Sequence, residues 1–185
     1  MSATRLRTFL VRTSFFGASF AGASFGGVVA AEAPPVAQLK KCVEEGQACS
    51  QAVVSGDDKK VVACTYPTLV KLVGGAYAMK DLLRNGREQM KAQSIELVGV
   101  TVYPPSELVQ GSSEVYAILK SHLVMKRPEG TMHQSSFLVG VSGDKGKSWR
   151  FVDGAGLDED KVKSVLPKLP SQMKLPPREE PTLEP

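Results

Sequence analysis

The sequence of 185 residues has little of what specialised chemistry usually requires, with three cysteines, two histidines and one tryptophan. Two histidines are too few to hold a zinc ion without further ligands. The sequence also lacks a serine-nucleophile elbow, a phosphate-binding glycine loop and a zinc-helix signature. It therefore predicts no catalytic residue, no cofactor-binding residue and no metal ligand.

The sequence also lacks an apolar run of the roughly 20 residues that span a bilayer. Its longest candidate, residues 15–30, is shorter and is diluted by glycine and serine. Three arginines and no acid precede this run, and small residues follow it. These zones predict a signal peptide over residues 1–30, cleaved after Ala30. Cleavage after Ala33 and an uncleaved anchor are the alternatives.

The chain also lacks a large excess of either positive or negative charge. The chain has 23 basic and 19 acidic residues, and three of the basic residues but none of the acids lie in the predicted signal. The mature chain then has 20 basic against 19 acidic residues, a net charge of +1. This excludes the basic surface of a nucleic-acid or membrane-surface binder. We expect an exported protein, periplasmic or extracellular, without nucleic acid or membrane as a partner after cleavage.

Helices are predicted first in the mature chain. Apolar and small residues recur at helical spacing over residues 36–55, and Gly56 ends that helix. An aspartate caps a second helix, which Pro67 kinks or splits. A third helix follows a double glycine and ends near residue 93. Its predicted inward face consists of Met79, Leu82, Leu83, Gly86 and Met90.

Alternating apolar residues replace the helical period from residue 94. A terminal helix, capped around Asp158, is predicted over 157–166. Six of the last nineteen residues are proline, so residues 167–185 are predicted to be an extended or disordered tail. Residues 34–166 then form one α+β domain, with N-terminal helices packed on a curved antiparallel sheet of four to five strands. The predicted strands are 94–102, a short one near Leu108, 114–126, 131–141 and 148–153.

This order of elements, with a double glycine before the helix that carries Met79 and Met90, resembles the nuclear-transport-factor-like or SnoaL-like cone fold. The resemblance covers about residues 36–165, and a cystatin-like arrangement is the alternative. It implies a homodimer through the outer face of the sheet. Two function classes follow: a non-catalytic module that binds a small apolar ligand or a protein, which we favour, and an isomerase, dehydratase or hydrolase acting on a small apolar substrate. The catalytic residues of ketosteroid isomerase, a cone-fold enzyme, have no match here.

Residues 142–149 resemble the Asp-box, Ser-x-Asp-x-Gly-x-Ser/Thr-Trp, of sialidases and other β proteins. The resemblance implies a structural turn and no sialidase activity, since one copy cannot form a propeller. In this turn Asp144 accepts backbone hydrogen bonds and Gly146 adopts a positive φ. The turn residues are Ser142, Asp144, Gly146 and Trp149.

An oxidising compartment makes a disulfide feasible. Cys42 and Cys49 lie on one helix, roughly 10 Å apart by the helical rise, which is too far to bridge. If the first two helices fold back about Gly56 and Asp57, Cys49 meets Cys64, because the two are equidistant from that turn. We predict a Cys49–Cys64 disulfide, with three buried thiols as the alternative.

Weak pocket candidates are Tyr116, His122 and His133. If Lys126 pairs with Thr131, the two histidines lie diagonally adjacent on one face of the hairpin. Pocket chemistry could also come from Tyr66, Tyr77, Tyr103, Glu96, Glu107, Glu114 and Asp153. A carboxylate within about 3 Å of a tyrosine hydroxyl in an apolar cavity would favour an enzyme. A hollow filled by Val100, Ile118, Phe137, Val139 and Phe151 would instead favour a binding surface outside it.

Overall fold

The computed structural model describes residues 36–184, so the predicted signal peptide lies outside the described residues. Four helices precede the sheet: α1 (Val36–Ser55), α2 (Asp58–Cys64), α3 (Pro67–Leu72) and α4 (Ala76–Ala92). Six strands form the sheet: β1 (Glu96–Val102), β2 (Val109–Gln110), β3 (Val115–Arg127), β4 (Gly130–Ser142), β5 (Arg150–Asp153) and β6 (Thr182–Glu184). A 3-10 turn, η1 (Gly154–Gly156), and helix α5 (Glu159–Val165) follow β5. The fold is α+β, as the sequence predicts.

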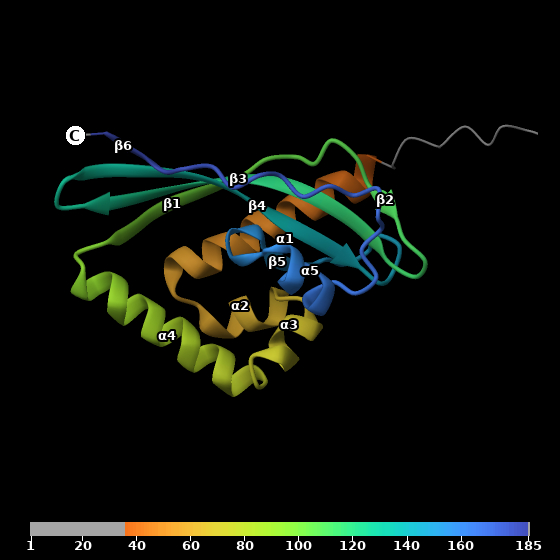
Figure 1. Cartoon of the computed structure of the whole chain (residues 1–185), viewed down its shortest axis with the longest axis horizontal. Coiled ribbons are helices and arrows are strands. Elements are labelled where there is room, and N and C mark those ends of the chain that lie inside the picture. Colours follow the sequence, from red (N-terminus) through yellow and green to blue (C-terminus); the bar gives the residue numbers. More distant parts are fainter. Residues whose placement is uncertain (1–35, 185) are drawn as a thin grey trace, which may run out of the picture. The chain divides into compact units, whose positions relative to one another are not determined.

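The long β3–β4 hairpin is the centre of the curled antiparallel sheet (Figure 1). The main strand order is β1-β3-β4-β5, and the short β2 also pairs with β3. Lys126 pairs with Thr131 next to the turn, which is the predicted register. Residues 131–133 at the start of β4 pair with β6, a C-terminal strand that the sequence did not predict. The sheet therefore has one strand more than expected.

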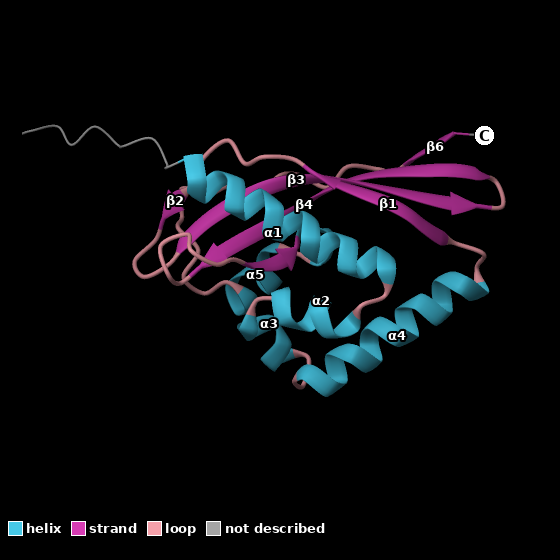
Figure 2. Ribbon diagram, turned by 180° about the vertical axis from the view of Figure 1, so that it is seen from behind, coloured by secondary structure: helices cyan, strands magenta, loops and turns pink. Residues whose placement is uncertain are grey.

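Helix α1 lies across the strands on one side of the sheet, and α2 packs beside it (Figure 2). The bounds of α1 coincide with the predicted ones. Pro67 splits the second predicted helix, because Tyr66 is extended and becomes the cap of α3. At this split Thr65 forms a parallel bridge with Phe151 of β5. None of the helices within residues 36–184 is long and apolar enough to cross a membrane.

Helix α4 contradicts one detail of the sequence analysis. Met79 is buried, but Leu82 is 60% exposed, so the prediction that Leu82 faces inward is wrong. The reason is that α4 packs mainly on the short helices α2 and α3, and they cover only a narrow stripe of it. An ion pair strengthens this contact, since Arg87 Nη2 lies 2.7 Å from Asp58 Oδ2 and holds the pKa of that carboxyl below its usual value.

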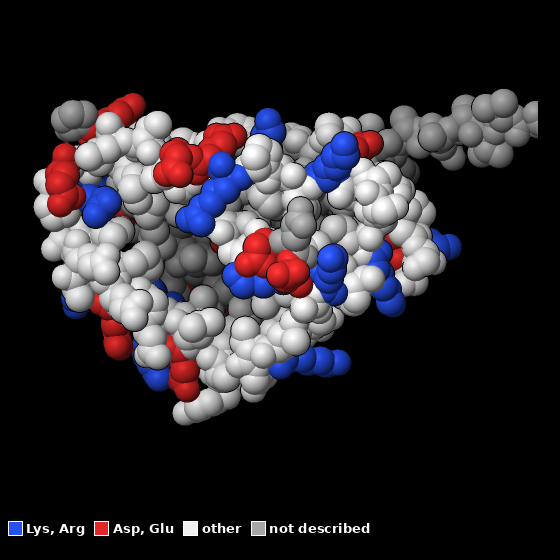
Figure 3. Space-filling view, in the orientation of Figure 1, with Lys and Arg blue, Asp and Glu red and all other residues white. Residues whose placement is uncertain are grey.

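The opposite face of the sheet, on the side of the molecule seen in Figure 3, is covered by α5 and the C-terminal tail. Tyr116, Phe137 and Val139 are buried there. The residues expected to fill one hollow thus lie on two faces. Ile118, Phe137 and Val139 belong to the tail side, and Phe151 belongs to the α1 side.

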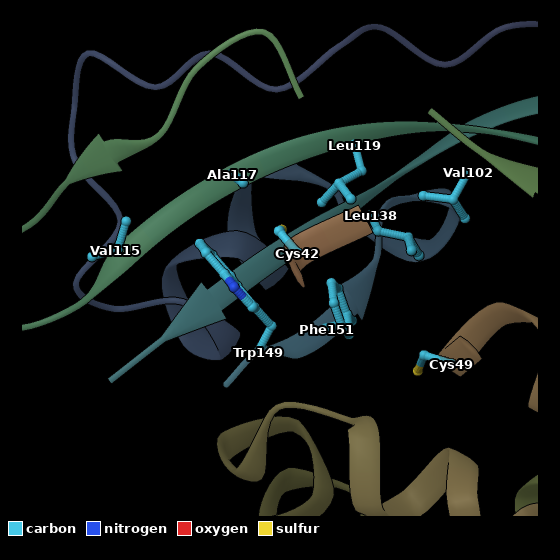
Figure 4. Close-up of a cluster of buried hydrophobic side chains, with 9 residues drawn as sticks. All are labelled: Cys42, Cys49, Val102, Val115, Ala117, Leu119, Leu138, Trp149 and Phe151. Carbon is cyan, nitrogen blue, oxygen red and sulfur yellow. The ribbon is translucent and has the colours of Figure 1, made fainter. Parts of the chain in front are cut away.

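Between α1 and the sheet lies a core of small and large residues around Trp149, Phe151 and Leu119 (Figure 4). Glycine lets the layers approach closely. A Cβ at Gly46 of α1 would lie 3.3 Å from side-chain atoms of both Leu119 and Phe151. A Cβ at Gly140 of β4 would lie 3.2 Å from Phe151. The close packing of α1 on the sheet therefore depends on a glycine on each side of the contact.

The Cys49–Cys64 disulfide is present, which confirms the predicted pairing. It joins α1 to α2 with 5.8 Å between the Cα atoms. Cys42 is a free thiol in the core, and burial, with a smaller contribution from the charge of Glu45, raises its pKa to about 12. A thiol held in the protonated form is a poor nucleophile. Cys42 is therefore a packing residue.

Candidate functional site

The C-terminal tail, residues 167–184, lies along the face of the sheet opposite α1, which we call the outer face. Leu169, Met173 and Leu175 pack against the buried cluster around Tyr116 and Phe137. Further along, Gln134 Nε2 donates a hydrogen bond to the Glu179 carbonyl oxygen at 3.1 Å. The tail then ends as β6, where Leu183 pairs with Met132. Two hydrogen-bonded turns lie within residues 166–173, before its extended part, and the tail acts as one wall of the site described next.

A cavity of about 640 Å³ opens between the tail, η1 and the outer face of β3 and β4. We call it the tail groove. On this side of the molecule the surface is hollowed beside α5, and side chains of both charges border the hollow (Figure 3). Its volume lies in the roughly 300–1,000 Å³ range of small-molecule sites. Part of its lining is apolar, formed by Phe137, Leu157, Pro176 and Pro177.

The charged lining of the tail groove is positive by one unit. Its cations are Lys120, Lys161 and Arg178, and its carboxylates are Asp158 and Glu179. Lys161 is already paired, because its Nζ lies 2.8 Å from Asp158 Oδ2, and this hydrogen bond lowers the pKa of Asp158. Among the carboxylates whose side chains the structure describes, none lies within 4.0 Å of the Lys120 or Arg178 nitrogens. These two cations are therefore available to a ligand.

The two histidines meet at the edge of the tail groove, on the same face as Lys120. His122 Nε2 lies 3.0 Å from His133 Nδ1, and the rings are stacked. His133 Nε2 lies 3.5 Å from Glu184 Oε2 of β6. The diagonal adjacency follows from the hairpin register that the sequence predicts. Within the described part of the chain, no group of three or more His, Cys, Asp or Glu side chains is placed to hold a metal ion.

Tyr116, the third predicted pocket residue, belongs to a different cluster. Its hydroxyl donates to Glu114 Oε2 at 2.7 Å, and the Tyr66 hydroxyl donates to Glu114 Oε1 at 3.0 Å. Burial and the adjacent carboxylate raise the pKa of both tyrosines. Tyr66, Glu114 and Tyr116 do not line the tail groove. The cluster meets the distance criterion for an enzyme but not the cavity criterion, and it ties α3 to β3.

Sequence reasoning named all three members of this cluster without bringing them together. Glu114 and Tyr116 are two residues apart, which is the spacing of one strand face, so that pair could have been found. Tyr66 could not, since it reaches the sheet only through the extended break between α2 and α3. The sequence also did not predict that residues 176–179 form a wall of the tail groove. The reason is that proline-rich composition is typical of segments without a fixed partner.

The Asp-box-like turn forms a closed network away from the tail groove. Asp144 Oδ1 accepts from the Ser142 hydroxyl at 2.8 Å and from the Ser148 amide at 2.9 Å. Ser142 Oγ accepts from the Gly146 amide at 2.7 Å, where φ is +83°. Trp149 is 1% exposed, and its amide donates to Glu45 of α1 at 2.7 Å. The geometry agrees with a structural turn that anchors α1.

Asp144→Asn is expected to remove part of the acid sensitivity of folding. Hydrogen bonds from Ser148 and Ser142 lower the pKa of Asp144 from 3.8 to about 2. A depressed folded-state pKa contributes stability that is complete above pH 3.8 and is lost as the pH falls to about 2. The Tm difference between the wild type and Asp144→Asn should therefore shrink over this interval. A difference that stays constant down to pH 2 contradicts this role of Asp144.

No protein-family model, no curated protein and no solved structure matches this chain. The geometry and charge of the tail groove are therefore the basis for assigning a function.

Proposed function

We propose that this protein is an exported, non-catalytic binding module that holds a small amphipathic anion in the tail groove. One observation carries the proposal: the groove combines an apolar lining with Lys120 and Arg178, which pair with none of the carboxylates whose side chains the structure describes. Binding sites of this size combine apolar lining with a few polar groups that orient the ligand. The purely apolar ligand expected from the sequence would leave both cations unused.

The chemistry of each wall specifies part of the ligand. Phe137 and Leu157 offer apolar contact to a hydrocarbon body. Lys120 and Arg178 offer donors to a carboxylate, sulfate or phosphate group, and such charge-assisted hydrogen bonds are about twice as strong as neutral ones. Since the groove has only one net positive charge, a ligand with a single anionic group suits it best.

Binding is favoured over catalysis because Asp158 and His122, two of the groove's candidate acids and bases, are engaged in structure. Asp158 caps α5 by accepting from the Lys161 amide at 2.9 Å and pairs with the Lys161 side chain. His122 is hydrogen-bonded to His133. The second candidate, a cone-fold enzyme acting on the same ligand, predicts turnover in the binding experiment below.

Export and the cone fold are part of the same proposal. The disulfide is typical of proteins in oxidising compartments, which supports the signal-peptide prediction. A helical layer followed by a curled antiparallel sheet supports the cone-fold resemblance. The homodimer that the resemblance implies would have to use the part of the outer face beyond the tail.

Replacing both cations should abolish recognition of the anionic group. We expect wild-type protein to bind decanoate, and the Lys120→Gln/Arg178→Gln variant to bind it at least about 10-fold more weakly, equal to about 1.4 kcal/mol. Isothermal titration measures both affinities. Affinity for neutral decanol should be the same in both proteins, because the apolar wall is intact.

Lys126→Gln is the matched control, since Lys126 lies on the same face of β3 as Lys120 but outside the tail groove. It should bind decanoate as the wild type does. Equal decanoate binding by all three proteins, or no binding by any of them, refutes the proposed ligand class. Conversion of decanoate to a product by the wild type would favour the enzyme.

A further inference from the structure

We propose that His122 and His133 form a two-nitrogen site for Cu(II) on the outer face of the β3–β4 hairpin. They are the only histidines in the chain, and the fold brings Nε2 of one to 3.0 Å from Nδ1 of the other. Both strands are long and continuously paired around them, so the sheet register fixes how the backbone positions of the two histidines are spaced. This site shares His122 with the tail groove, but its two nitrogen ligands do not require the anion proposed there.

The separation of the two nitrogens selects the metal geometry. With metal–nitrogen bonds of about 2.0–2.1 Å, a separation of 3.0 Å gives an N–metal–N angle of about 94°. That angle matches neighbouring ligands of a square-planar or tetragonal ion, which is the preference of Cu(II) and Ni(II). A tetrahedral Zn(II) site would need the nitrogens about 3.3 Å apart. Cu(II) also binds imidazole more tightly than Ni(II) or Zn(II).

Glu184 favours the ligand tautomer of His133. Its carboxylate lies 3.5 Å from His133 Nε2, which favours a proton on that nitrogen and leaves Nδ1 unprotonated, as a metal ligand must be. In the hydrogen bond the Nδ1 lone pair points at His122 Nε2, so the two rings must turn slightly for both lone pairs to meet at one ion. In metal sites, a carboxylate commonly accepts a hydrogen bond from the histidine ring nitrogen that does not bind the metal. When Cu(II) enters, the hydrogen of His122 moves from Nε2 to Nδ1, so both imidazoles stay neutral and no redox step is involved.

The site is open to solvent and to solutes. The side chain of His133 is 26% exposed, and His122 lines the tail groove. The described residues supply no third protein ligand at this place. Water or a bound small molecule therefore completes the coordination of Cu(II).

Titration of the full exported chain with Cu(II), supplied as its glycine complex, tests the proposal. We expect one Cu(II) per chain, an electron paramagnetic resonance spectrum with hyperfine splitting from two nitrogens, and Cu(II) binding at least about 10-fold tighter than Zn(II). His122→Gln and His133→Gln should each weaken Cu(II) binding at least about 10-fold and lose the two-nitrogen pattern. Circular dichroism checks that both variants are folded.

The Lys120→Gln/Arg178→Gln variant separates this site from the tail groove, because it should keep full Cu(II) affinity while losing decanoate. Cu(II) binding that is unchanged in both histidine variants overturns the proposal. Equal affinity for Zn(II) and Cu(II) in the wild type, which requires no variant, also overturns it.

Discussion

Replacing Cys49 and Cys64 together by alanine is expected to lower the free energy of unfolding by about 3 kcal/mol, the contribution of a disulfide that closes a loop of about 15 residues. The bond restricts the unfolded chain between α1 and α2. Those two helices place Thr65 beside β5, so their connection also positions the split before α3. Urea unfolding of the wild type and the double variant measures the difference.

Reductant supplies the control for the disulfide. It should destabilise the wild type by a similar amount and leave the double variant unchanged, because Cys42 is the one remaining thiol. Unfolded, unreduced wild-type protein should show one reactive thiol per chain. Three reactive thiols would show that the bond does not form.

Truncation after Leu166 is expected to cost about 3 kcal/mol of stability and to abolish decanoate binding. The deletion removes Leu169, Met173 and Leu175, three partly buried side chains that each contribute about half of a fully buried residue's 1.5–3 kcal/mol. It also removes Pro176–Glu179, a wall of the tail groove. Thermal or urea unfolding and isothermal titration measure the two effects.

Truncation after Glu179 is the matched control for the tail. It deletes β6, whose three residues are all exposed, and keeps the wall of the groove. We expect a loss of less than about 1 kcal/mol and retained decanoate binding. If truncation after Leu166 changes neither stability nor binding, the tail is not part of the folded domain.

Local patterns account for most of what could be predicted from the sequence. The helical period placed α1, Pro67 placed the break between α2 and α3, and the β3–β4 turn set the register that joins His122 to His133. The Cys49–Cys64 bond followed from folding back at Gly56. Each of these depends on residues close in sequence or on one symmetric turn.

The tail groove could not be predicted in this way. Its walls come from the middle of the sheet, from η1 and from Pro176–Glu179, which are far apart in the sequence and carry no shared period. Periodicity also identified the apolar stripe of α4, but it did not show how much of that stripe neighbouring helices would cover. For this reason Leu82 was wrongly predicted to face inward. Both failures concern contacts between distant segments.

Amide chemical-shift mapping of 15N-labelled wild-type protein with decanoate tests the proposed tail groove most directly. We expect saturable shifts at Ser135, Phe137, Ala155 and Arg178, the residues around the cavity, and no shifts along α4. Shifts centred on α4 or on the α1 side of the sheet, or no shifts at saturating decanoate, would contradict the assignment of the tail groove as the binding site.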